Sequence, residues 1–157
     1  MEVKHISDSE DALEVFDKRC ADMLSGKFIV ADAKIRGVLK SIAASRRLLS
    51  VFAHAAKSFD FDLEFDKAIA ITEDGKKRVR IPEDPERYAA FVYSLFLEID
   101  MKNIDLHKLL NEYYAIGQDV YDYYNYFKAS VVSTFKVYVG LLFFDEQIPS
   151  IFPTEQL

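Results

Sequence analysis

The sequence predicts an all-α fold, a single-domain bundle of six to seven helices with room for one small β-hairpin near residues 68–81. Apolar residues recur at spacings of three and four along most of the chain, which is the pattern of helices with one buried face. Helix-start and helix-end signals separate these stretches. A length of 157 residues suits one hydrophobic core. We therefore expect residues 1–157 to form one helical domain, with a tail at 1–6 and an extended, proline-containing tail at 145–157.

The first half of the chain predicts four helices, at about residues 7–26, 28–43, 46–58 and 59–66. The first begins at Ser7 and Glu10, which have the spacing of a capping box. Ser45 caps the third helix, which meets the second at a tight turn. Residues 59–66 alternate apolar and acidic side chains and so also fit a strand, but their apolar residues fit one helical face, and we favour a helix.

The middle of the chain predicts the hairpin and the central helix. Asp74 and Gly75 stand between two alternating runs and are typical of a hairpin turn. Asp84 and Pro85 then provide a cap and a proline suited to the first position of a helix. That helix, which runs to Ile99, is apolar nearly all round. We therefore expect it at the centre of the bundle.

Two further helices are predicted near the C-terminus. Asp105 caps the first of them and Gly117 ends it. The second runs from about residue 118 to 144, and its expected inward stripe is Val120, Tyr124, Phe127, Val131, Phe135, Tyr138 and Leu142. After Val137 the polar face stops, so Val139 and Phe143 are expected to point toward solvent. Such an apolar end is typical of a surface that another element or another chain covers.

Composition favours a reducing compartment, which we take to be the cytoplasm. Cys20 is the only cysteine, so no internal disulfide can form. The first ten residues are partly acidic and lack the apolar run of a signal peptide. The longest apolar stretch, residues 137–144, is far shorter than the ~20 residues of a membrane-spanning helix. We expect no membrane association.

No motif of a known active site is recognisable. No two of the five glycines lie closer than eleven residues, which excludes phosphate-binding and dinucleotide-binding glycine loops. His5, His54 and His107 lack the spacing that holds a metal on helices. The sequence therefore predicts a protein that is not an enzyme and has no cofactor or bound metal. An enzyme is a third alternative, and it would require a pocket assembled from residues scattered in sequence.

Tyrosine is the strongest anomaly, because seven of the nine tyrosines lie between residues 113 and 138. A tyrosine buries its ring and leaves its hydroxyl wet, which suits a protein interface and equally suits the border of a core. We predict an interaction or regulatory protein that forms a homo-oligomer or binds a protein partner through its C-terminal helix. The predicted interface residues are Tyr113, Tyr114, Tyr121, Tyr126, Val139 and Phe143.

The alternative prediction is a nucleic-acid-binding regulator. The formal charge of −6 disfavours it, but between residues 27 and 57 seven basic residues stand against one acidic residue. The second and third helices also loosely resemble a helix-turn-helix. The contacts predicted for this alternative are Arg36, Lys40, Arg46, Arg47, Lys77 and Arg78.

Overall fold

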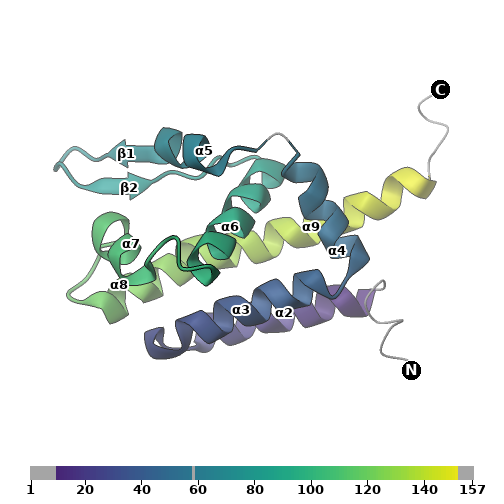
Figure 1. Ribbon diagram of the computed structural model, residues 1–157, viewed down its shortest axis with the longest axis horizontal. Helices are drawn as coiled ribbons and strands as arrows, with labels where there is room; N and C mark the ends of the chain where they lie inside the picture. The colour runs from purple at the N-terminus through teal and green to yellow at the C-terminus, as the bar shows by residue number, and fades with distance from the viewer. Residues whose placement is uncertain (1–9, 58, 152–157) are drawn as a thin grey trace.

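The computed structural model describes residues 10–57 and 59–151 and shows an α-helical bundle with one small two-stranded sheet (Figure 1). The predicted fold class is thus confirmed. The elements are α2 (Glu10–Ser25), the 3-10 turn η1 (Phe28–Val30), α3 (Ala31–Ala43), α4 (Arg46–Ala55), α5 (Phe61–Ala68), β1 (Ile69–Ile71), β2 (Lys77–Val79), α6 (Pro85–Asp100), α7 (Leu106–Tyr113), α8 (Val120–Phe127), the π-helical turn η2 (Lys128–Val132) and α9 (Ser133–Ile151).

Local capping chemistry explains where several helices begin. The side chains of Ser45, Asp84 and Asp105 each accept a hydrogen bond from the backbone N–H three residues ahead, at the starts of α4, α6 and α7. Such caps satisfy backbone donors that have no partner within the helix. Asp60 caps α5 in the same way, which confirms a helix over a strand for that segment.

The hairpin is confirmed at residues 69–79. β1 and β2 pair antiparallel, with Ile69 opposite Val79 and Ile71 opposite Lys77. Gly75 takes a φ of +83° in the turn, a conformation that glycine adopts without steric cost. The backbone N–H of Arg80 donates to the carbonyl of Ala68 at 2.7 Å, which extends the pairing beyond β2.

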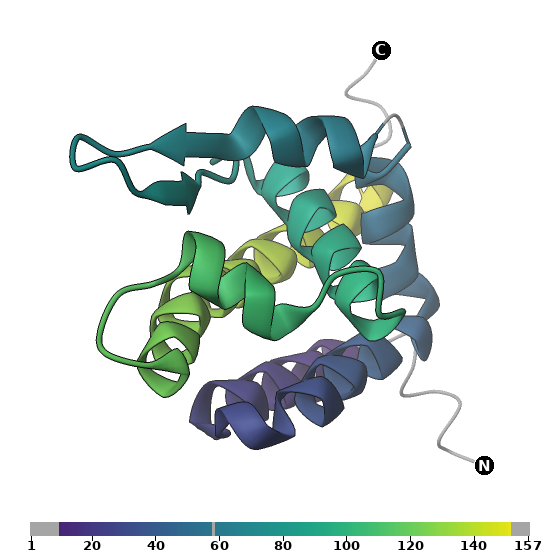
Figure 2. The same ribbon diagram turned by 60° about the vertical axis from the view of Figure 1, so that its left-hand side comes forward.

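The helix α6 lies at the centre of the bundle, as predicted, in contact with α3, α4, α5 and α9. Figure 1 shows α2 and α3 side by side along one edge, while α8, η2 and α9 form one long helical segment across the molecule. In Figure 2 the hairpin again lies on the side of the bundle away from α2 and α3. The hairpin and the α3–α4 pair thus belong to different faces.

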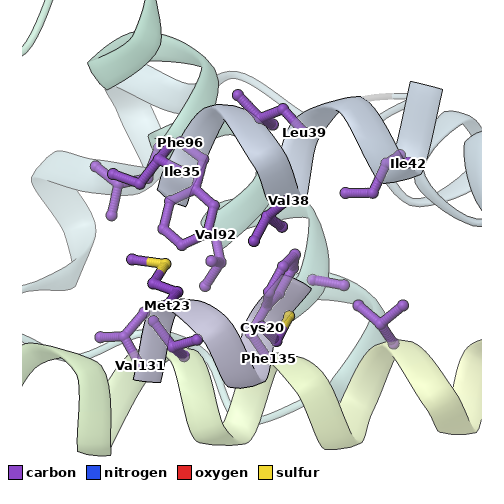
Figure 3. Close-up of a cluster of buried hydrophobic side chains, with 14 of the residues drawn as sticks. Cys20, Met23, Ile35, Val38, Leu39, Ile42, Val92, Phe96, Val131 and Phe135 are labelled. Carbon is purple, nitrogen blue, oxygen red and sulfur yellow. The ribbon is translucent and has the colours of Figure 1, made fainter. Parts of the chain in front are cut away.

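The core is made where α2, α3, α6 and the long C-terminal segment meet. Figure 3 shows Cys20 and Met23 of α2 facing Val131 and Phe135, with side chains of α3 and α6 closing the cluster. The ring of Phe135 packs edge-on against Phe96 at a centroid distance of 5.6 Å. Burial raises the pKa of the Cys20 thiol to about 12, so this cysteine is a protonated core side chain.

The inward stripe of the last helix differs from the predicted one because the helix contains a π-helical turn. η2 widens one turn by one residue, so every later position is rotated relative to a continuous α-helix. Val139 and Phe143 therefore face inward in place of Tyr138 and Leu142. The expectation that Val139 and Phe143 point to solvent is wrong, since both are fully buried.

Two predicted boundaries also change. The sixth helix ends at Tyr113 instead of reaching Gly117. α9 continues to Ile151, so the prediction of an extended tail is wrong for residues 145–151, which are helical. Pro149 stands in the last turn of α9, where its missing N–H removes one hydrogen bond close to the helix end. The predicted tail at 1–6, the capping residue Ser7 and residues 152–157 lie outside the described residues.

Candidate functional site

The predicted tyrosine interface does not form a single exposed surface. Tyr121 is exposed, but Tyr113 and Tyr114 are buried and Tyr126 is half-buried. Tyr113 packs edge-on against Phe65 of α5, whereas Tyr121 lies at the start of α8 beside Phe28. Packing among α5, α7 and α8 buries tyrosine rings whose neighbours could not be predicted from the sequence. Tyr113 and Tyr114 are therefore not exposed contact residues, and this part of the predicted interface is wrong.

Four tyrosines instead line a pocket of about 330 Å³ between the hairpin and the long C-terminal segment. We call this the tyrosine pocket. Its aromatic walls are Tyr88 of α6, Tyr114, which follows α7, Tyr126 of α8 and Tyr138 of α9. Its remaining lining comprises Arg78, Val79, Arg80, Ile81, Glu83, Ser130, Val131 and Thr134. The tyrosine excess thus has a specific place in the fold, which sequence spacing could not reveal.

The rings and hydroxyls of the pocket are held in place by packing and by the π-helical turn. The hydroxyl of Tyr88 donates a hydrogen bond toward the carbonyl oxygens of Ser130 and Val131, each 3.2 Å away. Both residues belong to η2. The ring of Tyr88 stands perpendicular to that of Tyr138, with centroids 5.1 Å apart. The rings of Tyr114 and Tyr126 are tilted relative to each other, and their centroids lie 5.9 Å apart. The pocket walls are therefore preorganised.

The phenols of Tyr88 and Tyr114 remain protonated at neutral pH. Burial raises the pKa of Tyr88 to about 12, against a smaller opposing effect of its hydrogen bond with Thr134. Burial also raises the pKa of Tyr114, and the neighbouring phenols of Tyr88 and Tyr126 act in the same direction. Within the described residues the Tyr114 hydroxyl has no hydrogen-bond partner. These groups act as neutral hydrogen-bonding and apolar walls, not as bases.

A second feature is an exposed apolar stripe on α9. Val137, Leu141 and Phe144 are 58, 54 and 43% exposed, although all three are large and apolar. Their spacings of four and three place them along one face of the helix, and we call them the α9 seam. The exposed apolar residues at this end are Val137, Leu141 and Phe144 instead of the predicted Val139 and Phe143, because η2 shifts the register. The spacing from Val137 to Phe144 is the signal that identifies them.

The α9 seam also includes an unusual glycine position. Gly140 lies three residues after Val137 and four before Phe144, so it belongs to the same face. Nothing lies within 4 Å of where a Cβ atom would stand. A glycine inside a helix costs about 1 kcal/mol relative to alanine, and the open space shows that no neighbour among the described residues requires it. Its side of the helix is open to a close approach from outside.

Length and composition alone would allow the helical segment from Val120 to Asp145 to cross a membrane. In the fold the same segment forms a large part of the core, where Phe127, Phe135 and Phe143 are fully buried. Its apolar character therefore has two sources, the buried face within the bundle and the α9 seam.

A hollow of about 510 Å³, larger than the tyrosine pocket, lies where η1, the start of α7 and the start of α8 meet. Phe28 and His107 contribute aromatic walls. The charged side chains Lys102 and Asp32 pair with each other at 2.9 Å across this hollow. Because those two charges are matched within the chain, the hollow offers less to a charged ligand than the tyrosine pocket does.

The basic residues predicted for nucleic-acid contact are divided between two faces. Arg36 and Lys40 lie on α3, whereas Lys77 and Arg78 lie on the hairpin away from it (Figures 1 and 2). Several are already engaged within the chain. Arg36 pairs with Asp100 at 3.1 Å, Lys77 pairs with Glu112 at 3.1 Å, and the Arg47 guanidinium lies 4.7 Å from the ring centre of Phe143. Arg46 is exposed at the start of α4. The structure does not unite the predicted set.

Among the described residues, no group of three or more His, Cys, Asp or Glu side chains could hold a metal ion. The candidate features are therefore the tyrosine pocket and the α9 seam. Comparisons with protein-family models, with curated proteins and with solved structures found no match, so these two features stand on the chain's own geometry.

Proposed function

We propose that this chain is a non-enzymatic interaction protein that self-associates by packing the α9 seams of two copies against each other. The observation that carries the proposal is the exposed row of Val137, Leu141 and Phe144 on one helix face. Burial of apolar surface contributes about 25 cal/mol of stabilisation for each Å², so covering such a row is favourable. Isolated exposed apolar residues are common, but a continuous row at helical spacing marks an association surface.

The spacing of the seam favours another helix as its partner. Val137, Leu141 and Phe144 follow the four-and-three alternation of a coiled-coil seam, and Ile148 and Ile151 continue it in the sequence. The backbone of α9 is helical as far as Ile151. A second copy of the chain brings an identical row, and a twofold axis lets each copy use the same patch.

Gly140 supports the close approach of two helices. Small residues at a helix surface let two backbones come near each other, and no described residue fills the space over Gly140. The last turns of α9 extend past α4 in Figure 1, and Leu141 and Phe144 are exposed on this part of the helix.

A second copy fits the seam better than a lipid bilayer does. Spanning a membrane would remove Phe135, Val139 and Phe143 from the core, and all three are fully buried. A narrow row with a spacing of 3.5 residues matches a helix-helix seam, whereas a helix lying on a membrane presents a broad apolar face opposite a strongly charged one.

Analytical ultracentrifugation over a concentration series tests the proposal. We expect the mass to rise from 18.1 kDa toward twice that value as the concentration increases. Leu141→Glu should remain at 18.1 kDa, because a charge in an apolar seam is costly. Leu63→Glu is the matched control, since Leu63 is similarly exposed but lies on α5. A wild-type chain that is monomeric throughout would overturn the proposal.

The same variants separate self-association from membrane binding. Co-sedimentation with vesicles of phosphatidylcholine and phosphatidylglycerol should show no binding by the wild-type chain or by Leu141→Glu. Wild-type binding that Leu141→Glu abolishes, with no dimer in solution, would assign the seam to a membrane instead.

A further inference from the structure

Two arginines, Arg78 and Arg80, line the tyrosine pocket. Arg78 makes one hydrogen bond, to the carbonyl oxygen of Lys77, and within the described residues neither Arg78 nor Arg80 has an acidic partner. Some other basic groups on the surface are paired, among them Arg87 with Glu64 at 3.1 Å. The pairing of Arg80 N–H with Ala68 holds this segment beside the hairpin. Both arginines line the pocket, and neither is engaged by a carboxylate of the described residues.

The pocket combines this positive charge with aromatic walls. Tyr88 and Tyr138 are arranged edge to face, which is a favourable geometry between aromatic rings and one that an inserted ring can extend. Val79, Ile81 and Val131 add apolar surface. A volume of about 330 Å³ lies at the small end of ligand pockets and suits one or two rings.

We propose that the tyrosine pocket binds a small aromatic carboxylate, with the carboxylate held by Arg78 and Arg80 and the ring inserted among Tyr88, Tyr126 and Tyr138. Arginine presents a planar fork of donors that matches the two oxygens of a carboxylate. The ring supplies the apolar area that a bare anion lacks. Binding at this pocket is independent of the α9 seam.

Glu83 gives the pocket a second, opposite electrostatic effect. Its carboxylate lines the same pocket and repels a bound anion, so the three charged lining residues contribute a net charge of two positive minus one negative, or +1. Removing the charge of Glu83 should therefore strengthen binding, whereas removing that of Arg78 or Arg80 should weaken it. A non-specific hydrophobic pocket would respond to none of these changes.

Calorimetric titration with 2-naphthylacetate tests the inference. The neutral analogue 2-(2-naphthyl)ethanol keeps the rings without the charge, and inorganic phosphate keeps an anion without the rings. The variants are Arg78→Gln, Arg80→Gln and Glu83→Gln, with Arg19→Gln as the control because Arg19 lies on α2 outside the pocket. These side chains are at least partly exposed, and circular dichroism would verify that each variant folds.

We expect saturable binding of 2-naphthylacetate by the wild-type chain and by Arg19→Gln. Each of Arg78→Gln and Arg80→Gln should bind about tenfold more weakly, the effect of losing one charge-assisted hydrogen bond, and Glu83→Gln should bind more tightly. The alcohol and phosphate should bind far more weakly than the acid. Absence of binding at concentrations on the order of 10 mM would overturn the inference. Equal affinity for the acid and the alcohol, or for the arginine variants and the control, would overturn it as well.

Discussion

The ammonium group of Lys128 caps the C-terminal end of α2, where its Nζ donates a hydrogen bond to the carbonyl oxygen of Gly26 at 2.6 Å. A second bond reaches the carbonyl of Leu24 at 3.0 Å, and the nitrogen lies 4.8 Å from the ring centre of Tyr124. The last carbonyls of a helix have no partner within it, and a cation there also interacts favourably with the negative end of the helix dipole. Burial of this side chain lowers the pKa of Lys128. One residue thus joins two distant parts of the chain.

Lys128→Met should destabilise the fold by about 2 kcal/mol. Methionine keeps most of the aliphatic bulk but leaves the carbonyl groups of Leu24 and Gly26 without this donor. Urea unfolding would measure the change, with Lys18→Met as the control because Lys18 is an exposed residue of α2. Equal losses in the two variants would show that the cap contributes nothing specific.

Phe143→Ala and Phe144→Ala should have very different effects on stability. Phe143 is fully buried beneath the Arg47 guanidinium, so its truncation should cost about 3–5 kcal/mol. Phe144 is 43% exposed, and its truncation should cost about 1 kcal/mol or less in the monomer. Chemical unfolding at low concentration would compare them. The reverse order would show that Phe144, and not Phe143, lies in the core, and it would remove the basis of the α9 seam.

Alkaline pH should reveal the burial of Tyr88. Its pKa rises from 10 to about 12 in the folded chain, so between these values the unfolded chain has released a proton that the folded chain still holds. The contribution of the protonated Tyr88 hydroxyl to the free energy of unfolding is therefore complete below pH 10 and is lost as pH rises toward 12. The stability of the wild-type chain relative to Tyr88→Phe should fall by about 1.4 kcal/mol per pH unit in that window. Parallel pH profiles from pH 8 to 11 would contradict this.

Gly140→Ala should stabilise the monomer and weaken the dimer. Alanine raises helix propensity by about 1 kcal/mol, and its methyl group meets no atom of the part of the chain that the structure describes. The same methyl group would separate two helices that pack closely at this position. Unfolding at low concentration and sedimentation at high concentration measure the two effects separately. If the variant gains stability and associates as strongly as the wild-type chain, Gly140 lies outside the contact.

Features that depend on local chemistry could be predicted from the sequence. The capping of α6 by Asp84 and the hairpin turn at Gly75 each need only a few neighbouring residues, and both are confirmed. The central position of α6 also followed, because a helix that is apolar on all sides must be covered on all sides.

Features set by distant contacts could not be predicted. The π-helical turn begins at Lys128, whose side chain binds carbonyl groups of α2 more than 100 residues away in sequence. Once the turn is present, Phe143 replaces Leu142 in the core. The pocket likewise requires Arg80, Tyr114 and Tyr138 from three separate segments.

Cysteine trapping at Phe144 tests self-association through the α9 seam most directly. Phe144 stands midway between Val137 and Ile151, so two copies meet there in either a parallel or an antiparallel arrangement. Cys20 can stay in place, since it is fully buried and protonated. Under mild oxidation, Phe144→Cys should form a disulfide-linked dimer much faster than Leu63→Cys, whose residue is exposed on α5. Equal rates of dimer formation for the two variants would contradict the proposal.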